Sequence, residues 1–265
     1  MRVGRLGAKY AAWTCAVLAL AGSCAPPPPA ELTAGSKRDH YLAALDRRQA
    51  SAEGLNAAAA LWLRPASGKR LPGVLSDLEI ERAERFRLTV SQPLGIALQI
   101  GGEGRHVVVL LPTRRAVFES DDVGDSIGLD RPADFLVRSV TALWRPDDAA
   151  WSDTGAGLLS WSDAGASLAL EIDARGRPAR VRVGTGRAGA LRIAYFDWFE
   201  SLGTEWPGRI EIEDSSSTAR LTCRIERLRR LTESERWHLA ITIPKGARHL
   251  EWEDLVRELT RRKGS

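Results

Sequence analysis

Apolar and polar residues alternate along most of this chain, from residue 57 to residue 243. Phe86, Leu88 and Val90, for example, alternate with Arg87 and Thr89. A period of two is typical of a β-strand with one buried and one exposed face. The strand candidates are 57–63, 74–81, 86–90, 96–100, 106–111, 115–119, 158–161, 168–172, 179–183, 191–195, 210–213, 221–225 and 237–243, of which 106–111 is apolar on both faces. Their links are of hairpin length, so we expect about twelve strands in series.

Three segments depart from this period and predict helices. Ser36 is a good N-cap for a helix that runs to about Ala52. Pro132 suits the first turn of a second helix, and apolar residues recur at helical spacing over 135–144. A third helix, 252–261, closes the chain.

The order of these elements predicts the fold class. Strands do not alternate with helices, which excludes a doubly wound parallel sheet. We expect a mainly β protein with a single curved antiparallel sheet. A sheet of about twelve strands must curl, close or split. The few helices would plug its concave side, and a helix that can detach from that side would act as a lid.

The N-terminal segment predicts export and lipid attachment. Arg2, Arg5 and Lys9 precede an apolar stretch, 10–21, and small residues lead directly into Cys24. This order is typical of a bacterial signal peptide that ends in a lipobox. The apolar stretch is shorter than the roughly 20 residues that a permanent membrane helix needs. We therefore expect Cys24 to be acylated and to become the first mature residue; the alternative is an ordinary cleaved signal.

The predicted signal peptide, strands and helices divide the chain into four parts. They are a signal peptide (1–23), a lipid anchor with a Pro-rich tether (24–35), the sheet domain (36–244) and a C-terminal helical extension (245–265). The tether begins with four prolines after Ala25. Consecutive prolines favour extended polyproline II, which would hold the domain off the membrane surface.

The charge balance argues against nucleic acid as a partner. The full chain has 38 Lys and Arg against 34 Asp and Glu, and the signal holds three of these cations and no acid. The mature chain therefore keeps 35 cations against 34 acids, a net charge of +1. This charge gives no electrostatic footprint for nucleic acid. Cys223 stands alone in an alternating strand, and we expect it to be a small buried apolar residue.

The sequence lacks the common motifs that would indicate an enzyme. The four histidines show no HExxH spacing, and there is no GxSxG elbow, P-loop or CxxC motif. The sequence thus predicts a protein that is not an enzyme and binds no metal. We expect no cofactor beyond the covalent lipid on Cys24.

Three pieces of sequence follow one another in a telling order. The first, 86–95, is a strand that runs into Pro93-Leu94-Gly95. The second is the helix 135–144, and the third combines the Tyr-containing strand 191–195 with Trp206-Pro207 and the next strand. In this order they resemble the LolA/LolB group of periplasmic lipoprotein carriers, over about residues 41–228. The lipobox favours the lipid-anchored LolB receptors within that group. The segment 245–265 extends beyond the last strand of the group.

The resemblance implies an open half-barrel of about eleven strands whose cavity accepts the acyl chains of outer-membrane lipoproteins. Alternation supplies an apolar face that would line this cavity, and the same face could equally form an ordinary dry core. Its residues are Phe86, Leu88, Leu98, Ile100, Leu170, Ile193, Ile210, Leu221 and Ile225. The helix over the cavity, a lid or a core plug, would contribute Phe135, Leu136, Val140 and Trp144.

A loop between two strands is the candidate for membrane insertion. It comprises Pro93, Leu94, Gly95 and Ile96. By resemblance, Leu94 would be needed to insert the cargo into the membrane. A leucine between Pro93 and Gly95 at the end of a strand should lie in a tight turn, and a turn tip normally faces water. The alternative is that Leu94 folds back onto the core.

The resemblance also implies partners and a location. We expect acylated lipoproteins, a LolA-like carrier and membrane lipid as partners, and a monomer. Ala25 follows the anchor in place of the aspartate that retains enterobacterial lipoproteins in the inner membrane, which implies the periplasmic face of the outer membrane. Two alternatives remain: a carrier or sensor of free lipid or glycolipid, and an envelope scaffold with a closed core. A cavity would argue against the scaffold.

Overall fold

The computed structural model describes residues 34–66, 68, 71–82, 85–93, 95–124, 131–145, 152–153, 158–163, 166–185, 189–215, 219–236 and 239–260. All of them belong to one compact unit, Leu32–Ser265. Among these residues the buried core begins at Tyr41. The unit therefore has a core of its own that includes no residue before its first helix.

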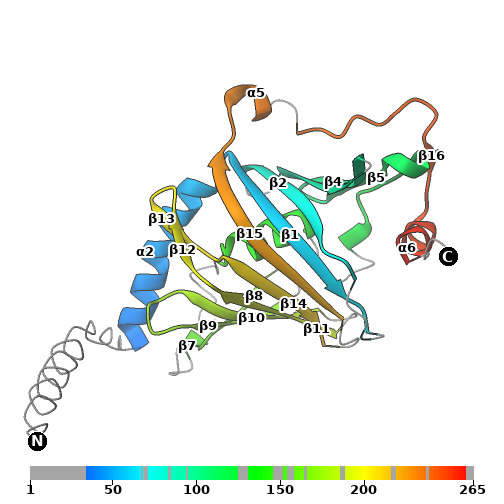
Figure 1. Ribbon diagram of the computed structural model, residues 1–265. Helices are drawn as coiled ribbons and strands as arrows, with labels where there is room; N and C mark the ends of the chain where they lie inside the picture. Colours follow the sequence, from blue (N-terminus) through cyan, green and yellow to red (C-terminus); the bar gives the residue numbers. More distant parts are fainter. Residues whose placement is uncertain are drawn as a thin grey trace, which may run out of the picture. The chain divides into compact units, whose positions relative to one another are not determined.

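One sheet of 14 strands dominates the unit (Figure 1). Its strands are β1 (Leu55–Arg64), β2 (Val74–Arg82), β3 (Arg85–Gln92), β4 (Gly95–Glu103), β5 (His106–Leu111), β6 (Ala116–Ser120), β7 (Ser152–Asp153), β8 (Leu158–Asp163), β9 (Ala166–Ile172), β10 (Pro178–Thr185), β11 (Gly189–Phe196), β14 (Arg209–Asp214), β15 (Arg220–Arg230) and β16 (Arg248–His249). They lie in the order β16-β6-β5-β4-β3-β2-β1-β15-β14-β11-β10-β9-β8-β7. In this described sheet only β16 and β6 are parallel neighbours.

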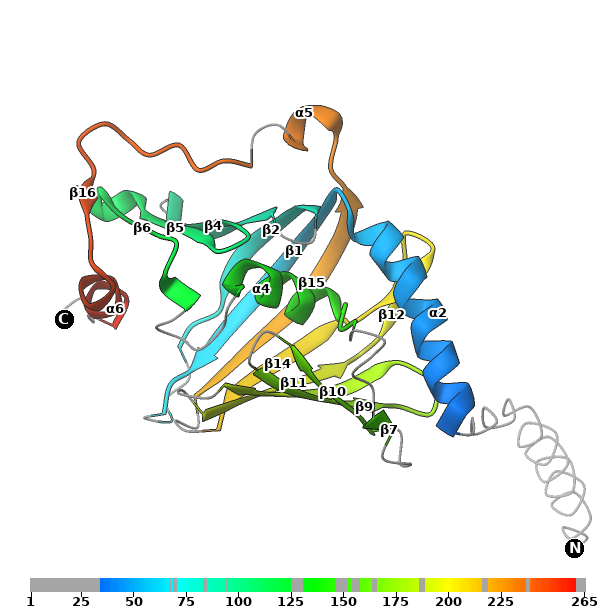
Figure 2. The ribbon, with the colours of Figure 1, turned by 180° about the vertical axis from the view of Figure 1, so that it is seen from behind.

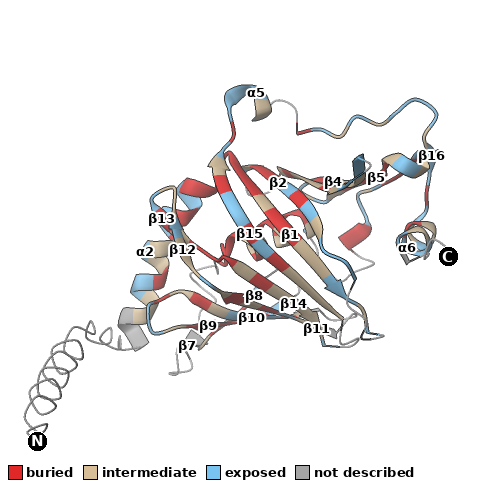
Figure 3. Ribbon diagram, viewed as in Figure 1, coloured by how far each residue is buried: buried red, intermediate tan, exposed pale blue. Residues whose placement is uncertain are grey.

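A seam between β1 and β15 joins the two sides of the sheet. The pairing runs from Leu55 opposite Arg230 to Arg64 opposite Arg220, with a bulge between Ala58 and Ala59. Strands β2–β6 follow on one side of this seam and β14 and β11–β7 on the other. Buried and more exposed residues alternate along β15 (Figure 3). The chain therefore builds one half of the sheet first and returns through β15 to close the second half against β1.

The described helices are few. They are α2 (Ala34–Ala52), α4 (Pro132–Thr141), α5 (Glu233–Arg236) and α6 (Trp252–Thr260), with a 3-10 turn, η1, at Pro112–Arg114. Figure 2 looks onto the face of the sheet that α4 covers, which we call the concave face. In α2, Tyr41, Leu45, Arg48 and Ala52 are buried. Their spacing places them on one side of the helix, which packs against the domain.

The structure confirms the predicted fold class: a mainly β chain with one large, curved, open sheet and few helices. The strand predicted at 237–243 is wrong, because its described part, 239–243, has no ladder partner. Leu239 is buried there, and the side chain of Ile241 packs against Gly101. The period of two thus comes from an extended segment whose alternate residues pack onto the sheet from outside.

Pattern reasoning also missed short elements. A separate hairpin, β12 (Phe199–Ser201) with β13 (Thr204–Trp206), lies between β11 and β14 in the sequence. Leu202 and Gly203 both have positive φ in its two-residue turn, the conformation that favours tight hairpins. Segment 245–265, which the sequence sets apart as an extension, contributes β16 to the sheet and α6 beside it.

Candidate functional site: an apolar cavity

An apolar cavity of about 660 Å³ lies between the concave face of the sheet, α4 and α6. Six of its wall residues form one row across six neighbouring strands. In order from β1 to β6 they are Ala57, Leu78, Leu88, Ile100, Val109 and Phe118. Residues that face each other across a ladder point to the same side of the sheet. Register alone therefore aligns these apolar side chains into a continuous wall.

Small side chains keep the floor of the cavity open. Ala57 and Ala59 on β1 line it, and Ser76 on β2 pairs with Ala59. Large apolar residues at these positions would fill the space, as protein interiors normally do. The hydroxyl of Ser76 donates to the carbonyl of Ala59 at 3.1 Å. The hydroxyl hydrogen of Ser76 is thus used in a bond to the backbone, and the wall of the cavity stays apolar.

Helix α4 roofs the cavity. Phe135, Leu136 and Val140 line it from above. The beginning of the helix sits close to β4 because Gly102 has no side chain: a Cβ there would lie 3.0 Å from the Cβ of Ala133. The N-terminal end of the helix can therefore lie directly against the middle of the sheet.

The other end of α4 is held by a buried polar group. Arg48 on α2 is 1% exposed and donates to the carbonyls of Ala142 at 2.9 Å and Glu205 at 3.2 Å. Ala142 ends the helix in the left-handed conformation, and a cation at a helix C-terminus is electrostatically favourable. Desolvation lowers the pKa of Arg48. Two carbonyls compensate the burial of its charge.

Trp144, just beyond α4, completes this anchor. Its indole N–H donates to the hydroxyl of Tyr195 at 2.6 Å, and the hydroxyl of Tyr41 donates to its carbonyl. Burial raises the pKa of both tyrosines. Both hydroxyls therefore stay neutral, and the exit of α4 is tied to α2 and β11.

The structure brings most of the predicted wall residues together. Seven of the nine line the cavity, namely Phe86, Leu88, Leu98, Ile100, Ile210, Leu221 and Ile225. Leu170 and Ile193 do not; both are fully buried in the core below α2. Trp144 likewise lies in that core and not on the cavity wall. Alternation correctly gives the face of the sheet on which a residue lies, but not what covers that part of the face.

Several wall residues were missed by the sequence reasoning. Val107, Val109 and Phe118 come from β5 and β6, and Trp252 and Leu255 from α6. A signal was present, because the strand candidate 106–111 is apolar on both faces and the closing helix is amphipathic. Nothing in the sequence links these two distant segments to each other.

Two predicted functional positions, Cys24 and Leu94, lie outside the described residues. The flanks of Leu94 are described: Pro93, Gly95 and Ile96 are all exposed. Gly95 has a φ of 121°, which L-residues with a side chain rarely adopt. The turn at this end of β3 and β4 therefore faces water on both sides of residue 94.

The described ranges show no candidate metal site and no candidate membrane-spanning helix. No group of three or more His, Cys, Asp or Glu side chains there is placed to hold a metal ion. Among the same residues, no helix combines the length and apolarity needed to cross a bilayer. Cys223 lines the cavity, and burial raises the pKa of its thiol to about 12, so this thiol stays protonated and unreactive.

Solved structures similar to this chain share one architecture. A LolA superfamily protein from Nitrosomonas europaea is 14% identical, with a TM-score of 0.50, and covers 76% of this chain and 94% of its own. A putative outer membrane lipoprotein-sorting protein domain from Vibrio parahaemolyticus is 12% identical, with a TM-score of 0.52, and covers 74% and 94%. The chain has a LolA-like fold.

A protein of the DUF1329 family from Desulfovibrio piger is similar to the same degree, with 11% identity, a TM-score of 0.52 and coverage of 79% of this chain and 99% of its own. No family model matches the sequence, and no curated protein matches it significantly. The LolA-like fold is thus recognised from its three-dimensional structure at sequence identities of 11–14%.

Proposed function

We propose that this protein is a lipid-anchored receptor that accepts the acyl chains of lipoproteins in its cavity and helps to insert them into the outer membrane. The observation that carries the proposal is the apolar cavity on the concave face, roofed by a helix. Pockets of about 300–1,000 Å³ typically bury most of a ligand's surface, and apolar lining selects apolar ligands. An envelope scaffold with a closed core would have this face filled.

The cavity suits an acyl chain in size. A methylene takes roughly the space of a water molecule in the liquid, ~30 Å³. A chain of about 16 carbons then needs about 480 Å³, less than the 660 Å³ of the cavity. Each buried methylene contributes about 0.8 kcal/mol, or about 12 kcal/mol for the whole chain. Transfer through water would be very slow, so a receptor has to take the chain directly from another apolar cavity.

The proposal includes attachment and insertion. Acylation of Cys24 would fix the protein to the periplasmic face of the outer membrane. Leu94, between the exposed Pro93 and Ile96, would enter the membrane during delivery. The reaction is non-covalent and needs no cofactor, and the donor would be a LolA-like carrier that meets a monomeric receptor.

Lipoprotein transfer in vitro tests this proposal. The unit 32–265 is mixed with a LolA-like carrier loaded with labelled lipoprotein, and movement of the label is followed. We expect uptake by the unit. Uptake of a free fatty acid without uptake of lipoprotein would favour the carrier of free lipid. No uptake of either would contradict the proposal.

Insertion is tested with the full-length chain on liposomes. Leu94→Glu should leave folding and uptake intact but reduce delivery. The matched control is Leu75→Glu, the same substitution at an exposed leucine of the neighbouring strand β2. Equal loss of delivery in both variants would contradict a specific role for Leu94, and unfolding of Leu94→Glu would place that residue in the core.

A further inference from the structure

The chain after β15 wraps around the edge of the sheet. We call residues 231–260 the C-terminal strap; residues 237–238 in it lie outside the described residues. It passes α5, runs outside the sheet where Ile241 packs on Gly101, and pairs with the edge strand β6 through β16. Beyond that edge it ends in α6, which lines the cavity on the concave side. Figures 1 and 2 show this path from both sides.

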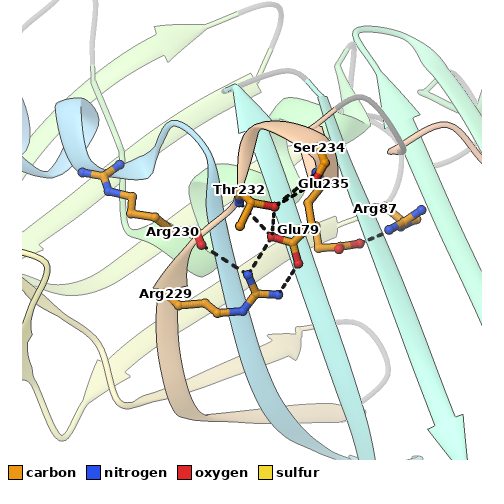
Figure 4. A network of polar contacts seen from close by, with 7 residues as sticks. All are labelled: Glu79, Arg87, Arg229, Arg230, Thr232, Ser234 and Glu235. Atoms are coloured by element: carbon orange, nitrogen blue, oxygen red, sulfur yellow. Dashed lines mark hydrogen bonds and ion pairs between the residues drawn. The ribbon is translucent and has the colours of Figure 1, made fainter.

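The beginning of the strap is firmly held (Figure 4). Arg229 makes two hydrogen bonds of 2.8 Å to the carboxylate of Glu235. The same carboxylate accepts the backbone N–H of Thr232 at 2.8 Å, which is half of a capping box. Leu231 is buried, and its N–H donates to the carbonyl of Gly54. This end of the strap is therefore a fixed point on the outside of the sheet.

The far end of the strap is held by a two-residue strand, by ion pairs at Glu258 and by the packing of Leu250 and Leu255 in an apolar cluster with β5 and β6. Strand β16 consists of two residues, and two backbone hydrogen bonds of 2.8 Å join Arg248 and Leu250 to β6 and its preceding turn. Glu258 on α6 pairs with Arg114 and with Arg248, and Arg114 also donates to the backbone carbonyl of Glu258. Both arginine side chains are partly exposed to solvent. Ion pairs of this kind contribute little and are screened by salt.

The face of α6 toward the cavity is only partly covered. Leu255 is buried and the ring of Trp252 lies 5.7 Å from that of Phe118. Val256 and Leu259 also line the cavity, yet they are 41% and 53% exposed. Apolar side chains that face unfilled space gain free energy when an apolar ligand covers them. A chain in the cavity would therefore strengthen the attachment of α6.

We propose that α6 is a gate: it swings away from β5 and β6 to admit an acyl chain and closes over the chain once it is bound. Strand β16 makes the last pairing with the sheet before α6, so α6 can pivot there when its ion pairs at Glu258 break. Helix α4, by contrast, packs closely on Gly102 at its beginning and is held by Arg48 at its end, and it serves as the static roof. This inference rests on the proposed function, because it concerns entry to the same cavity.

Binding kinetics of the unit 32–265 test the gate. The probe is a fatty acid of about 16 carbons with a polarity-sensitive fluorophore, mixed rapidly with protein. Glu258→Gln removes the ion pairs between α6 and the sheet. We expect association and dissociation rates to rise together by about fivefold, the effect of losing two weak ion pairs, with a smaller change in Kd. The matched control is Asp254→Asn, which removes an ion pair within α6, to Arg257, and should leave both rates unchanged.

A second measurement follows α6 itself. Glu253→Cys places a thiol on the exposed side of the helix, and Cys223, the other cysteine of the unit, is buried and does not compete for a maleimide dye. Anisotropy of the dye should rise on probe binding, and the dye in the Glu258→Gln background should be more mobile before binding.

The outcomes separate the gate from the proposed function. Probe binding by the wild type with rates and anisotropy that Glu258→Gln leaves unchanged would overturn the gate and leave the receptor standing. Failure of the wild-type unit to bind the probe would overturn the gate, and only failure to take up lipoprotein as well would overturn the receptor.

Discussion

The two halves of the sheet have similar strands but different coverings. On β8–β11, the row Leu159, Leu170, Val181 and Ile193 is at most 1% exposed. On β1–β6, the equivalent row borders a cavity, and Leu88 and Ile100 in its middle are only half-buried. We call the first the filled half and the second the hollow half. The difference comes from what lies above the rows: α2 and Trp144 fill one, while α4 and α6 leave space over the other.

The filled half and the hollow half have different structural roles. The filled half supplies a conventional core, and Arg48 and Trp144 extend from it to hold the end of α4. Apolar side chains of the hollow half can then remain without protein contacts above them, since the end of α4 is held by residues of the filled half. Marginal stability makes such an arrangement sensitive to loss of the filled half.

The largest expected effect is on folding, and it distinguishes the halves directly. Leu170→Ala in the filled half removes a fully buried side chain and should lower the free energy of unfolding by about 2–5 kcal/mol. Leu88→Ala in the hollow half leaves no new void in a packed region and should cost about 1 kcal/mol. Urea unfolding of both variants measures this. Equal losses would show that the hollow half is packed in solution.

The next effect concerns the link between the halves. Arg48→Met keeps an unbranched apolar stem but removes the donor to the carbonyls of Ala142, at the end of α4, and Glu205, in β13, which should lower stability by about 1.5–3 kcal/mol. Arg47→Met is the control, because Arg47 is the exposed neighbour on the same helix. Limited proteolysis should also become faster near α4 in Arg48→Met only. A similar loss in both variants would contradict the anchoring role of Arg48.

A third change closes the hollow half without disturbing the filled one. In Ala59→Phe, the aromatic ring would occupy cavity volume that a ligand otherwise fills. Losing the burial of two methylenes weakens binding about tenfold, so a fatty acid probe should bind at least that much more weakly. Ala58→Phe, one residue earlier, points to the other side of the sheet and should bind normally. Undiminished binding by Ala59→Phe would place the ligand elsewhere.

The smallest effect lies outside both halves, at the start of the strap. Hydrogen bonds from Arg229 and Thr232 lower the pKa of Glu235 from 4.5 to about 2. A carboxyl with a depressed folded pKa stabilises the protein above its unfolded pKa, and this contribution is lost as the pH falls from 4.5 to 2. Glu235→Gln should therefore be slightly less stable than wild type at neutral pH, and the gap should vanish near pH 2. Thermal melts over this range check the trend, and a gap that widens in acid would contradict it.

Individual strands and wall residues show how much of the structure can be predicted from the sequence. Alternation located most of the long strands and the face of each, because a strand's side-chain period is a local property. The segments 57–63 and 106–111 are instead continuously apolar strand candidates. The same alternation misled at 237–243, where an extended segment packs on the sheet without joining it. Leu88 and Ile210, two of the predicted wall residues, line the cavity, whereas Leu170 has the same local pattern and lies in the filled half.

The sequence by itself determined the fold class, the apolar face of the sheet and the order of its hairpins, since these depend on residue periodicity and on turns between neighbours. Only the tertiary structure decided which part of that face is hollow. That outcome depends on where α2, α4 and α6 lie, and these helices are positioned by Arg48, Gly102 and Glu258 through contacts with residues far away in the chain. A void is the absence of a neighbour, and no local pattern of residues records it.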